Sequence, residues 1–156
     1  MTINSISIVL HIFAAVFWVG GMLFAHMFLR PVAAAQLEPP VRLTLWVGVF
    51  KRFFPVVWLS IFFLPLTGYL MIFEIWGSMA HTPLYVHIMN GLGTVMILIY
   101  LHVYFAPFKR LKEAVIKQDW PEGGRNLNII RQMVGINMMI GLATILVASA
   151  GRMYIP

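Results

Sequence analysis

Four of the five histidines in this 156-residue chain form two matched pairs. His11 and His26 lie 15 residues apart in the first apolar run, and His87 and His102 lie 15 residues apart in the third. Fifteen residues of α-helix rise about 22 Å and end about 60° from their starting direction, so the two imidazoles of each helix lie at two depths on similar faces. Ionisable side chains within membrane helices are costly and mark functional sites. The spacing therefore predicts two sites between the first and third runs.

Two haem b groups are the cofactors that this arrangement favours. A six-coordinate haem iron takes one neutral imidazole on each side of the porphyrin. We therefore expect His11 and His87 to ligate one haem, and His26 and His102 to ligate the other. Such a protein would be a b-type membrane cytochrome that transfers electrons. A quinone, a periplasmic protein or a small oxidant such as superoxide would be its redox partner.

Glycines and arginines near these histidines complete the predicted haem sites. Glycines between the histidines would leave room for the porphyrin, and arginines near the helix ends would pair with its propionates. The glycines are Gly20, Gly21, Gly91 and Gly93, and the arginines are Arg30, Arg42, Arg52 and Arg152. Helix packing is the simpler explanation for the glycines, and anchoring at the membrane surface is the simpler explanation for the arginines.

Copper is the main alternative to haem. Imidazole and thioether groups both bind copper, and thioethers select Cu(I). The chain has 11 methionines, of which Met22 lies four residues before His26 and Met89 lies two residues after His87. The alternative function is thus a copper-handling transporter with histidine and methionine ligands. A structural or proton-relay role for the histidines is the third possibility.

The elements that must position these residues are membrane helices. Of all residues, 61% are hydrophobic and 10% are charged, whereas soluble domains have about 45–50% and about 25%. A spanning helix needs about 20 apolar residues. Four runs qualify, at residues 6–29, 53–73, 84–106 and 129–150. Short connections predict an all-α, up-down-up-down four-helix bundle in a single membrane domain, residues 1–156. Pro65 should kink the second helix, and Asn137 should hydrogen-bond across helices.

The distribution of Lys and Arg predicts the orientation in the membrane. Ten of the eleven basic residues fall in or beside the first and third connections, at Arg30, Arg42, Lys51, Arg52, Lys109, Arg110, Lys112, Lys117, Arg125 and Arg131. Basic connections stay in the cytoplasm, so both termini should be periplasmic, in a bacterial inner membrane. This bias also explains the net charge of +6 without nucleic acid. Residues 109–118 should extend the third helix as a basic amphipathic segment on the membrane surface.

Missing residue types limit the chemistry further. The chain has no cysteine, so it forms no disulfide, thiolate metal site or iron–sulfur cluster. No paired carboxylates lie within the spans, so acid–base hydrolysis is not expected, and an oxidoreductase activity is left open. The expected partners are the lipid bilayer, a redox partner and a second copy of the chain.

Four segments carry a resemblance to two families of membrane proteins. They are LHIFAAVFWVGGMLFAHMFLR, PVVWLSIFFLPLTGYLMI, YVHIMNGLGTVMILIYLH and RQMVGINMMIGLATILVASAGR. They resemble the helices of CopD-like proteins and of HemJ-type protoporphyrinogen oxidases, and both resemblances imply a four-helix core. The CopD-like resemblance implies copper transport, whereas the HemJ-like one implies b-type haem and porphyrinogen oxidation. HemJ-type proteins place a lysine two residues after the third-helix histidine, where this chain has Met89.

Overall fold

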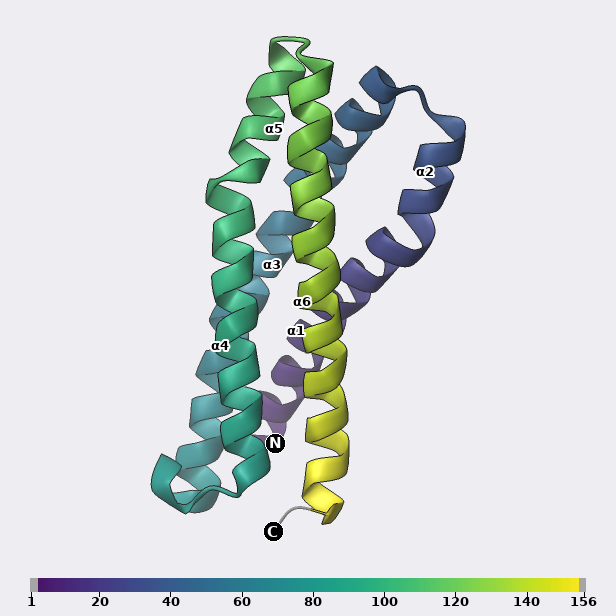
Figure 1. Cartoon of the computed structure of the whole chain (residues 1–156). Coiled ribbons are helices and arrows are strands. Elements are labelled where there is room, and N and C mark those ends of the chain that lie inside the picture. The colour runs from purple at the N-terminus through teal and green to yellow at the C-terminus, as the bar shows by residue number, and fades with distance from the viewer. Residues whose placement is uncertain (1–2, 155–156) are drawn as a thin grey trace.

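The structure is an antiparallel bundle of four long helical rods. The computed structural model describes residues 3–154, with the side chains of residues 4–151, and contains no strand over that range. In chain order the elements are α1 (Ile3–Phe24), the π-helix η1 (Ala25–Leu29), α2 (Arg30–Gln36), α3 (Pro39–Trp76), the 3₁₀ turn η2 (Met79–His81), α4 (Leu84–Phe105), α5 (Pro107–Ile116) and α6 (Trp120–Tyr154). The rods α1–η1–α2, α3, α4–α5 and α6 run alternately up and down (Figure 1). Four helices are long and apolar enough to cross a membrane, which confirms the predicted all-α fold.

All four rods extend beyond the predicted spans at the same end of the bundle. The first rod continues to Gln36, α3 begins at Pro39, α5 continues to Ile116 and α6 begins at Trp120 (Figure 1). This end carries the basic connections. The backbone hydrogen bonds of a helix do not require apolar side chains, so the helices continue into these polar segments. The 38 residues of α3 measure about 57 Å, against a hydrocarbon core of about 30 Å. The basic end therefore projects from the apolar core of the bilayer.

Proline and glycine residues set the ends of α3. The helix begins at Pro39, whose missing N–H costs nothing at a first helical position. It ends at Gly77, which adopts the left-handed conformation at φ 73° and donates its N–H to the Phe73 carbonyl. Pro55 and Pro65 lie inside α3, which stays a continuous helix through both. The kink at Pro65 stays a prediction.

Aromatic side chains form the core between α3 and the α4–α5 rod. Phe54 packs edge-on against Phe108 with ring centroids 4.7 Å apart. The Tyr100 hydroxyl donates a hydrogen bond to the Phe54 carbonyl over 3.1 Å, which satisfies a polar group inside the core. Val57 and Leu111 next to these rings are fully buried. This core fixes α3 against α4 and α5.

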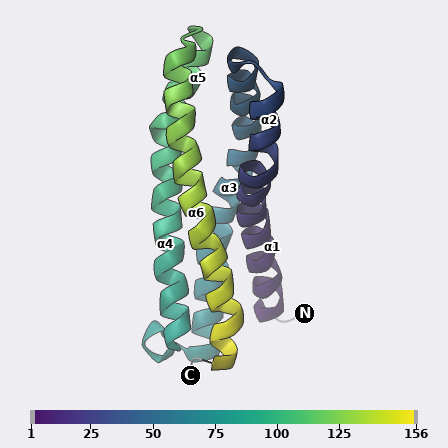
Figure 2. The same ribbon diagram turned by 45° about the vertical axis from the view of Figure 1, so that its right-hand side comes forward.

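The lateral order of the helices determines which side chains can meet. The longest packed interfaces join α1 to α3 and α4 to α6. Figure 2 shows α1 and α4 on opposite sides of the bundle, although they run parallel as predicted. Side chains on these two helices are therefore neighbours only where they point through the centre of the bundle.

Helix α5 is a packed part of the bundle. The helical extension predicted over residues 109–118 is confirmed up to Ile116, and its position on the membrane surface stays a prediction. Phe108, Leu111 and Ala114 are buried, and α5 packs against α6 and α3. The apolar stripe of Phe108, Leu111 and Ala114 is thus covered by protein, while Lys109 and Arg110 are exposed.

Two adjacent glycines give a stability prediction for the α1–α3 interface. A Cβ atom at Gly21 would overlap the ring of Phe53, whereas a Cβ at Gly20 would meet no atom within 4 Å. We expect Gly21→Ala to lower the free energy of unfolding by about 1–3 kcal/mol through overpacking. The control Gly20→Ala should leave it unchanged or raise it. Thermal unfolding of both variants in one detergent checks this, and equal midpoints would contradict the packing described.

Candidate functional site

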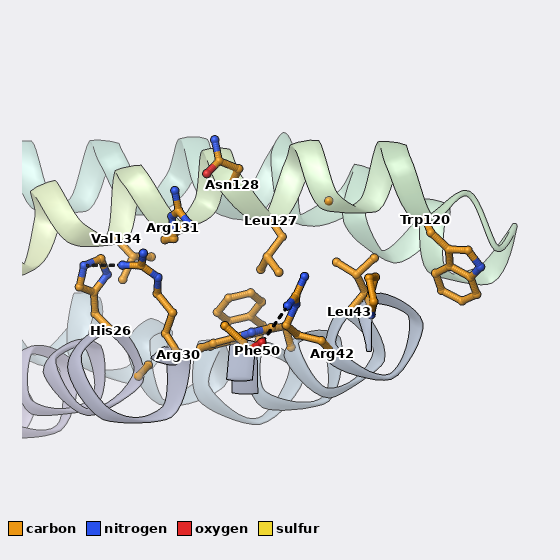
Figure 3. Close-up of a pocket in the computed structure, with 15 residues that line it drawn as sticks. His26, Arg30, Arg42, Leu43, Phe50, Trp120, Leu127, Asn128, Arg131 and Val134 are labelled. Atoms are coloured by element: carbon orange, nitrogen blue, oxygen red, sulfur yellow. Dashed lines mark hydrogen bonds between the residues drawn. The ribbon is translucent and has the colours of Figure 1, made fainter. Parts of the chain in front are cut away.

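A cationic cavity lies at the basic end of the bundle, between η1–α2, the start of α3 and the first half of α6 (Figure 3). Its volume is about 330 Å³. The residues that line it are Ala25, His26, Arg30, Ala34, Pro39, Arg42, Leu43, Trp46, Phe50, Trp120, Gly124, Leu127, Asn128, Arg131 and Val134. Three arginines and a histidine thus meet aromatic walls, and no carboxylate lines the cavity within the described part of the chain.

A local change of helix type positions His26 in this cavity. Residues Ala25–Leu29 form a π-helix, in which the Arg30 N–H bonds to the Ala25 carbonyl. Single π-turns are rare and occur frequently at functional sites, because they redirect side chains. The Arg30 Nη1 atom lies 3.5 Å from His26 Nε2 (Figure 3). Across the cavity, a Cβ at Gly135 of α6 would lie 3.0 Å from His26 Cε1, so this glycine makes room for the imidazole.

His11 is held against α3 near the opposite end of α1. Its Nδ1 lies 2.9 Å from Oγ1 of Thr67, and the Thr67 hydroxyl donates to the Phe63 carbonyl. The threonine oxygen is therefore the acceptor for a His11 Nδ1–H group. A Cβ at Gly68 would lie 3.5 Å from His11 Cε1, so glycine again borders the imidazole.

The remaining histidines do not approach these two. His87 Nε2 lies 3.0 Å from Oγ1 of Thr82 in the turn before α4, and His81 Nδ1 lies 2.9 Å from Oγ of Ser78. His102 is exposed on α4. None of these hydrogen bonds joins His11 to His87 or His26 to His102; α1 packs on α3 and lies across the bundle from α4 (Figure 2).

The two histidines of each predicted pair nevertheless share a depth. Along α6, Gly135 lies beside His26 of α1, while Gly141 and Gly151 lie beside Met96 and Tyr85 of α4. Counting along α4 from these two contacts puts His102 level with Gly135, and thus level with His26. The same count puts His87 level with the last turns of α6. A count along α1 from Val19, which lies beside Gly141, puts His11 at that level too. Ligation of haem by these pairs stays a prediction.

Three methionines from three helices are buried in the interior of the bundle, where α1, α4 and α6 converge. Met22 of α1, Met96 of α4 and Met138 of α6 are 2%, 4% and 5% exposed and belong to one buried cluster. A Cβ at Gly141 would lie 2.8 Å from Val19 of α1 and 3.1 Å from Cε of Met96, so the three helices converge there. We call these three side chains the methionine layer.

A buried polar group accompanies the methionine layer. Asn137 donates a hydrogen bond of 3.3 Å to the Met96 carbonyl, which confirms the predicted bond between helices. Its Oδ1 atom is buried and has no hydrogen-bond partner among the described residues. Buried acceptors of this kind are rare in proteins and call for an explanation. The layer therefore combines three soft sulfur atoms with one free oxygen acceptor.

A single face of α1 connects both histidines with the methionine layer. His11, Ala14, Trp18, Met22 and His26 recur at intervals of three or four residues, which is the spacing of one helix face. The middle three are buried and the two histidines are half-buried. This inward face thus places a nitrogen ligand near each end of the spanning region and a sulfur ligand between them.

The other predicted residues have mixed outcomes. Arg30 and Arg42 line the cationic cavity, whereas Arg52 is exposed outside it and donates to the Gly48 carbonyl. The side chain of Arg152 lies outside the described residues. Among the glycines, Gly21 packs against Phe53, and Gly20, Gly91 and Gly93 border open space.

Several residues of these sites were missed at the sequence level. Sequence reasoning sought small residues on the helices that carry the histidines, but the facing helices supply them, at Gly68 and Gly135. Arg131 was assigned only to membrane topology, although it lines the cavity with Trp46 and Trp120. The methionines of the layer are far apart in sequence and form no local motif. Within the described residues, no three His, Asp or Glu side chains gather as a metal site.

Comparison with known proteins gives one match. The family model of copper resistance protein D, CopD, matches residues 47–150, which run from α3 into the last third of α6. No curated protein and no solved structure matches the chain. The matched segment includes Met96, Asn137 and Met138, and α1 lies before it.

Proposed function

The chain belongs to the CopD family, and from that premise we propose that it is a multi-pass membrane protein that handles copper. The methionine layer is the observation that carries this proposal. Thioether sulfur is a soft ligand that selects Cu(I) over the hard divalent cations. Three such sulfurs, from Met22, Met96 and Met138, are buried in one cluster, and Asn137, whose Oδ1 atom has no hydrogen-bond partner among the described residues, bonds to the Met96 carbonyl. In this proposal the layer holds a single Cu(I) ion.

The inward face of α1 supports a path for copper through the bundle. His11 lies toward one end of this face, Met22 in the middle and His26 at the cationic cavity. Neutral imidazole is also a copper ligand. A copper ion moving along this face would meet imidazole nitrogen at His11 and His26 and thioether sulfur at Met22, which lies four residues before His26.

A Cu(I) titration tests the proposal. The purified chain in detergent, kept anaerobic, is titrated with Cu(I) against a chromogenic Cu(I) chelator. We expect it to retain about one Cu(I) per chain, because there is one methionine layer. Complete transfer of the copper to the chelator would contradict the proposed function.

For the localisation we propose a bacterial inner membrane with both termini on the periplasmic side. The support is the charge asymmetry, since basic connections stay in the cytoplasm and ten of the eleven basic residues lie toward the end of the bundle that carries α2 and α5. We expect a C-terminal alkaline phosphatase fusion to be active and a C-terminal fluorescent protein fusion to be dark. The opposite pair of results would reverse the orientation and place the cationic cavity at the periplasmic surface.

A di-haem b-type membrane cytochrome is a second candidate function. The equal depths of His11 with His87 and of His26 with His102 favour it. In this case Arg30 and Arg42 would pair with propionates, a quinone would be the redox partner, and a second copy of the chain is the proposed assembly partner. Protein purified from cells supplied with haem should then show a Soret band and two haems per chain in a pyridine haemochrome assay. A colourless preparation would reject this candidate and the HemJ-like porphyrinogen oxidase together.

A further inference from the structure

We infer that the cationic cavity binds a phosphate group, either in an anionic lipid headgroup or as free phosphate. Arg30, Arg42 and Arg131 line one cavity, and no carboxylate among the described lining residues neutralises them. Guanidinium groups bind phosphate oxygens in bidentate pairs, and basic pockets between membrane helices bind phospholipid headgroups. This inference does not rest on copper binding.

The depth of the cavity matches the position of lipid phosphates. Arg30 directly follows the first hydrophobic span, Arg42 precedes the second and Arg131 lies at the start of the fourth. Arg30 and Arg131 therefore lie at the predicted boundary between the apolar core and water, where headgroups lie, and Arg42 lies on the water side of it. The volume of about 330 Å³ is within the range of small-molecule sites.

The walls suit an amphiphile, whose apolar part lies against aromatic rings. Trp46, Phe50 and Trp120 line the cavity together with Leu43 and Val134. These side chains would contact the glycerol and upper acyl carbons of a lipid while the arginines hold its phosphate.

Anchoring at the membrane surface does not by itself explain this arrangement. Basic residues that only set topology point outward, as Lys51, Lys109 and Arg110 do at the same end of the bundle. Arg30 and Arg42 are instead half-buried. The Arg30 Nη1 atom also lies 3.5 Å from Nε2 of the His26 imidazole. An anion in the cavity would compensate the positive charge of the three arginines that line it.

Binding is tested on the delipidated full chain in a neutral detergent. The probes are a short-chain phosphatidylglycerol, a short-chain phosphatidylcholine and sodium phosphate. The binding of each probe is measured by tryptophan fluorescence. We expect phosphatidylglycerol to change the tryptophan fluorescence in a saturable way. The change should be absent in a Trp46→Phe, Trp120→Phe variant, because these two rings line the cavity. Saturation by sodium phosphate at similar concentrations would assign the site to free phosphate. Failure of both anions, or equal binding of phosphatidylcholine, overturns the inference.

Charge-matched variants show whether the cavity is the site. Arg30→Gln, Arg42→Gln and Arg131→Gln together should weaken phosphate-group binding about 100-fold, because each basic residue near an anionic headgroup contributes roughly fivefold. The control Lys51→Gln, Lys109→Gln and Arg110→Gln removes three charges from the same end and should change binding little. Should the triple cavity variant not fold, Arg131→Gln alone, at an exposed position, should still weaken binding several-fold. Equal losses in the two charge-matched variants would overturn the assignment to the cavity.

Discussion

Replacing Met22, Met96 and Met138 together by leucine is expected to weaken Cu(I) binding by at least about 100-fold while the helical fold persists. Loss of a residue that only supports a metal ligand already costs about 10- to 100-fold in affinity, and this variant removes all three sulfur ligands. Leucine has nearly the volume of methionine, so the buried cluster should stay filled at a cost below about 1.5 kcal/mol per site. The Cu(I) affinity is measured by chelator competition, and helicity by circular dichroism.

The chain offers a matched control for this substitution. Met139 directly follows Met138 but is 61% exposed on the lipid side of α6. Met139→Leu removes one thioether of the same type from the same helix and should leave the Cu(I) affinity unchanged. If Met139→Leu and Met138→Leu lower the affinity equally, or if the triple variant binds Cu(I) like the unmodified chain, the methionine layer is not the site.

Leu111→Ala in α5 is expected to produce a large loss of stability. Leu111 is fully buried where α5 packs against α6 and α3. Truncation of a buried leucine removes apolar contacts and leaves a cavity, which together cost about 2–5 kcal/mol. The free energy of unfolding is measured by chemical denaturation in mixed micelles.

The comparison for Leu111 is Ile116 at the end of the same helix. Ile116 is 81% exposed, so Ile116→Ala should change the free energy of unfolding by no more than about 0.5 kcal/mol. A helix lying on the membrane surface would lose little stability from either substitution. Equal small effects would therefore contradict the packing of α5 in the bundle and favour the surface position predicted from the sequence.

The fold was predictable because the bilayer restricts the options. Only helices and closed barrels satisfy every backbone polar group in lipid, so four apolar runs of sufficient length dictate four helices. The ends of the rods were not predictable from hydropathy, since residues 30–36 and 120–128 are too polar to span. They are helical because they pack against neighbouring rods, as Ala33 and Asn126 do.

The candidate sites were only partly predictable because depth and lateral position depend on different information. Residue spacing along a helix gives depth, and it placed His26 and His102 at one level. Lateral neighbours depend on which helices pack together, and α1 packs on α3 instead of α4. The π-turn at His26 also has no sequence signature, since Ala25–Leu29 is an ordinary apolar segment. Spacing alone therefore gave the depths of the histidines but not the packing of α1 on α3, and it overlooked Met96 and Met138.

X-ray absorption at the copper K-edge of the Cu(I)-loaded chain tests the copper proposal most directly. The methionine layer predicts sulfur scatterers in the first coordination shell, because Met22, Met96 and Met138 would supply the ligands. The same measurement on the triple leucine variant, loaded with equal copper, should show no sulfur shell. A first shell made only of nitrogen and oxygen in the unmodified chain would contradict the proposal that this membrane protein holds copper at its buried methionines.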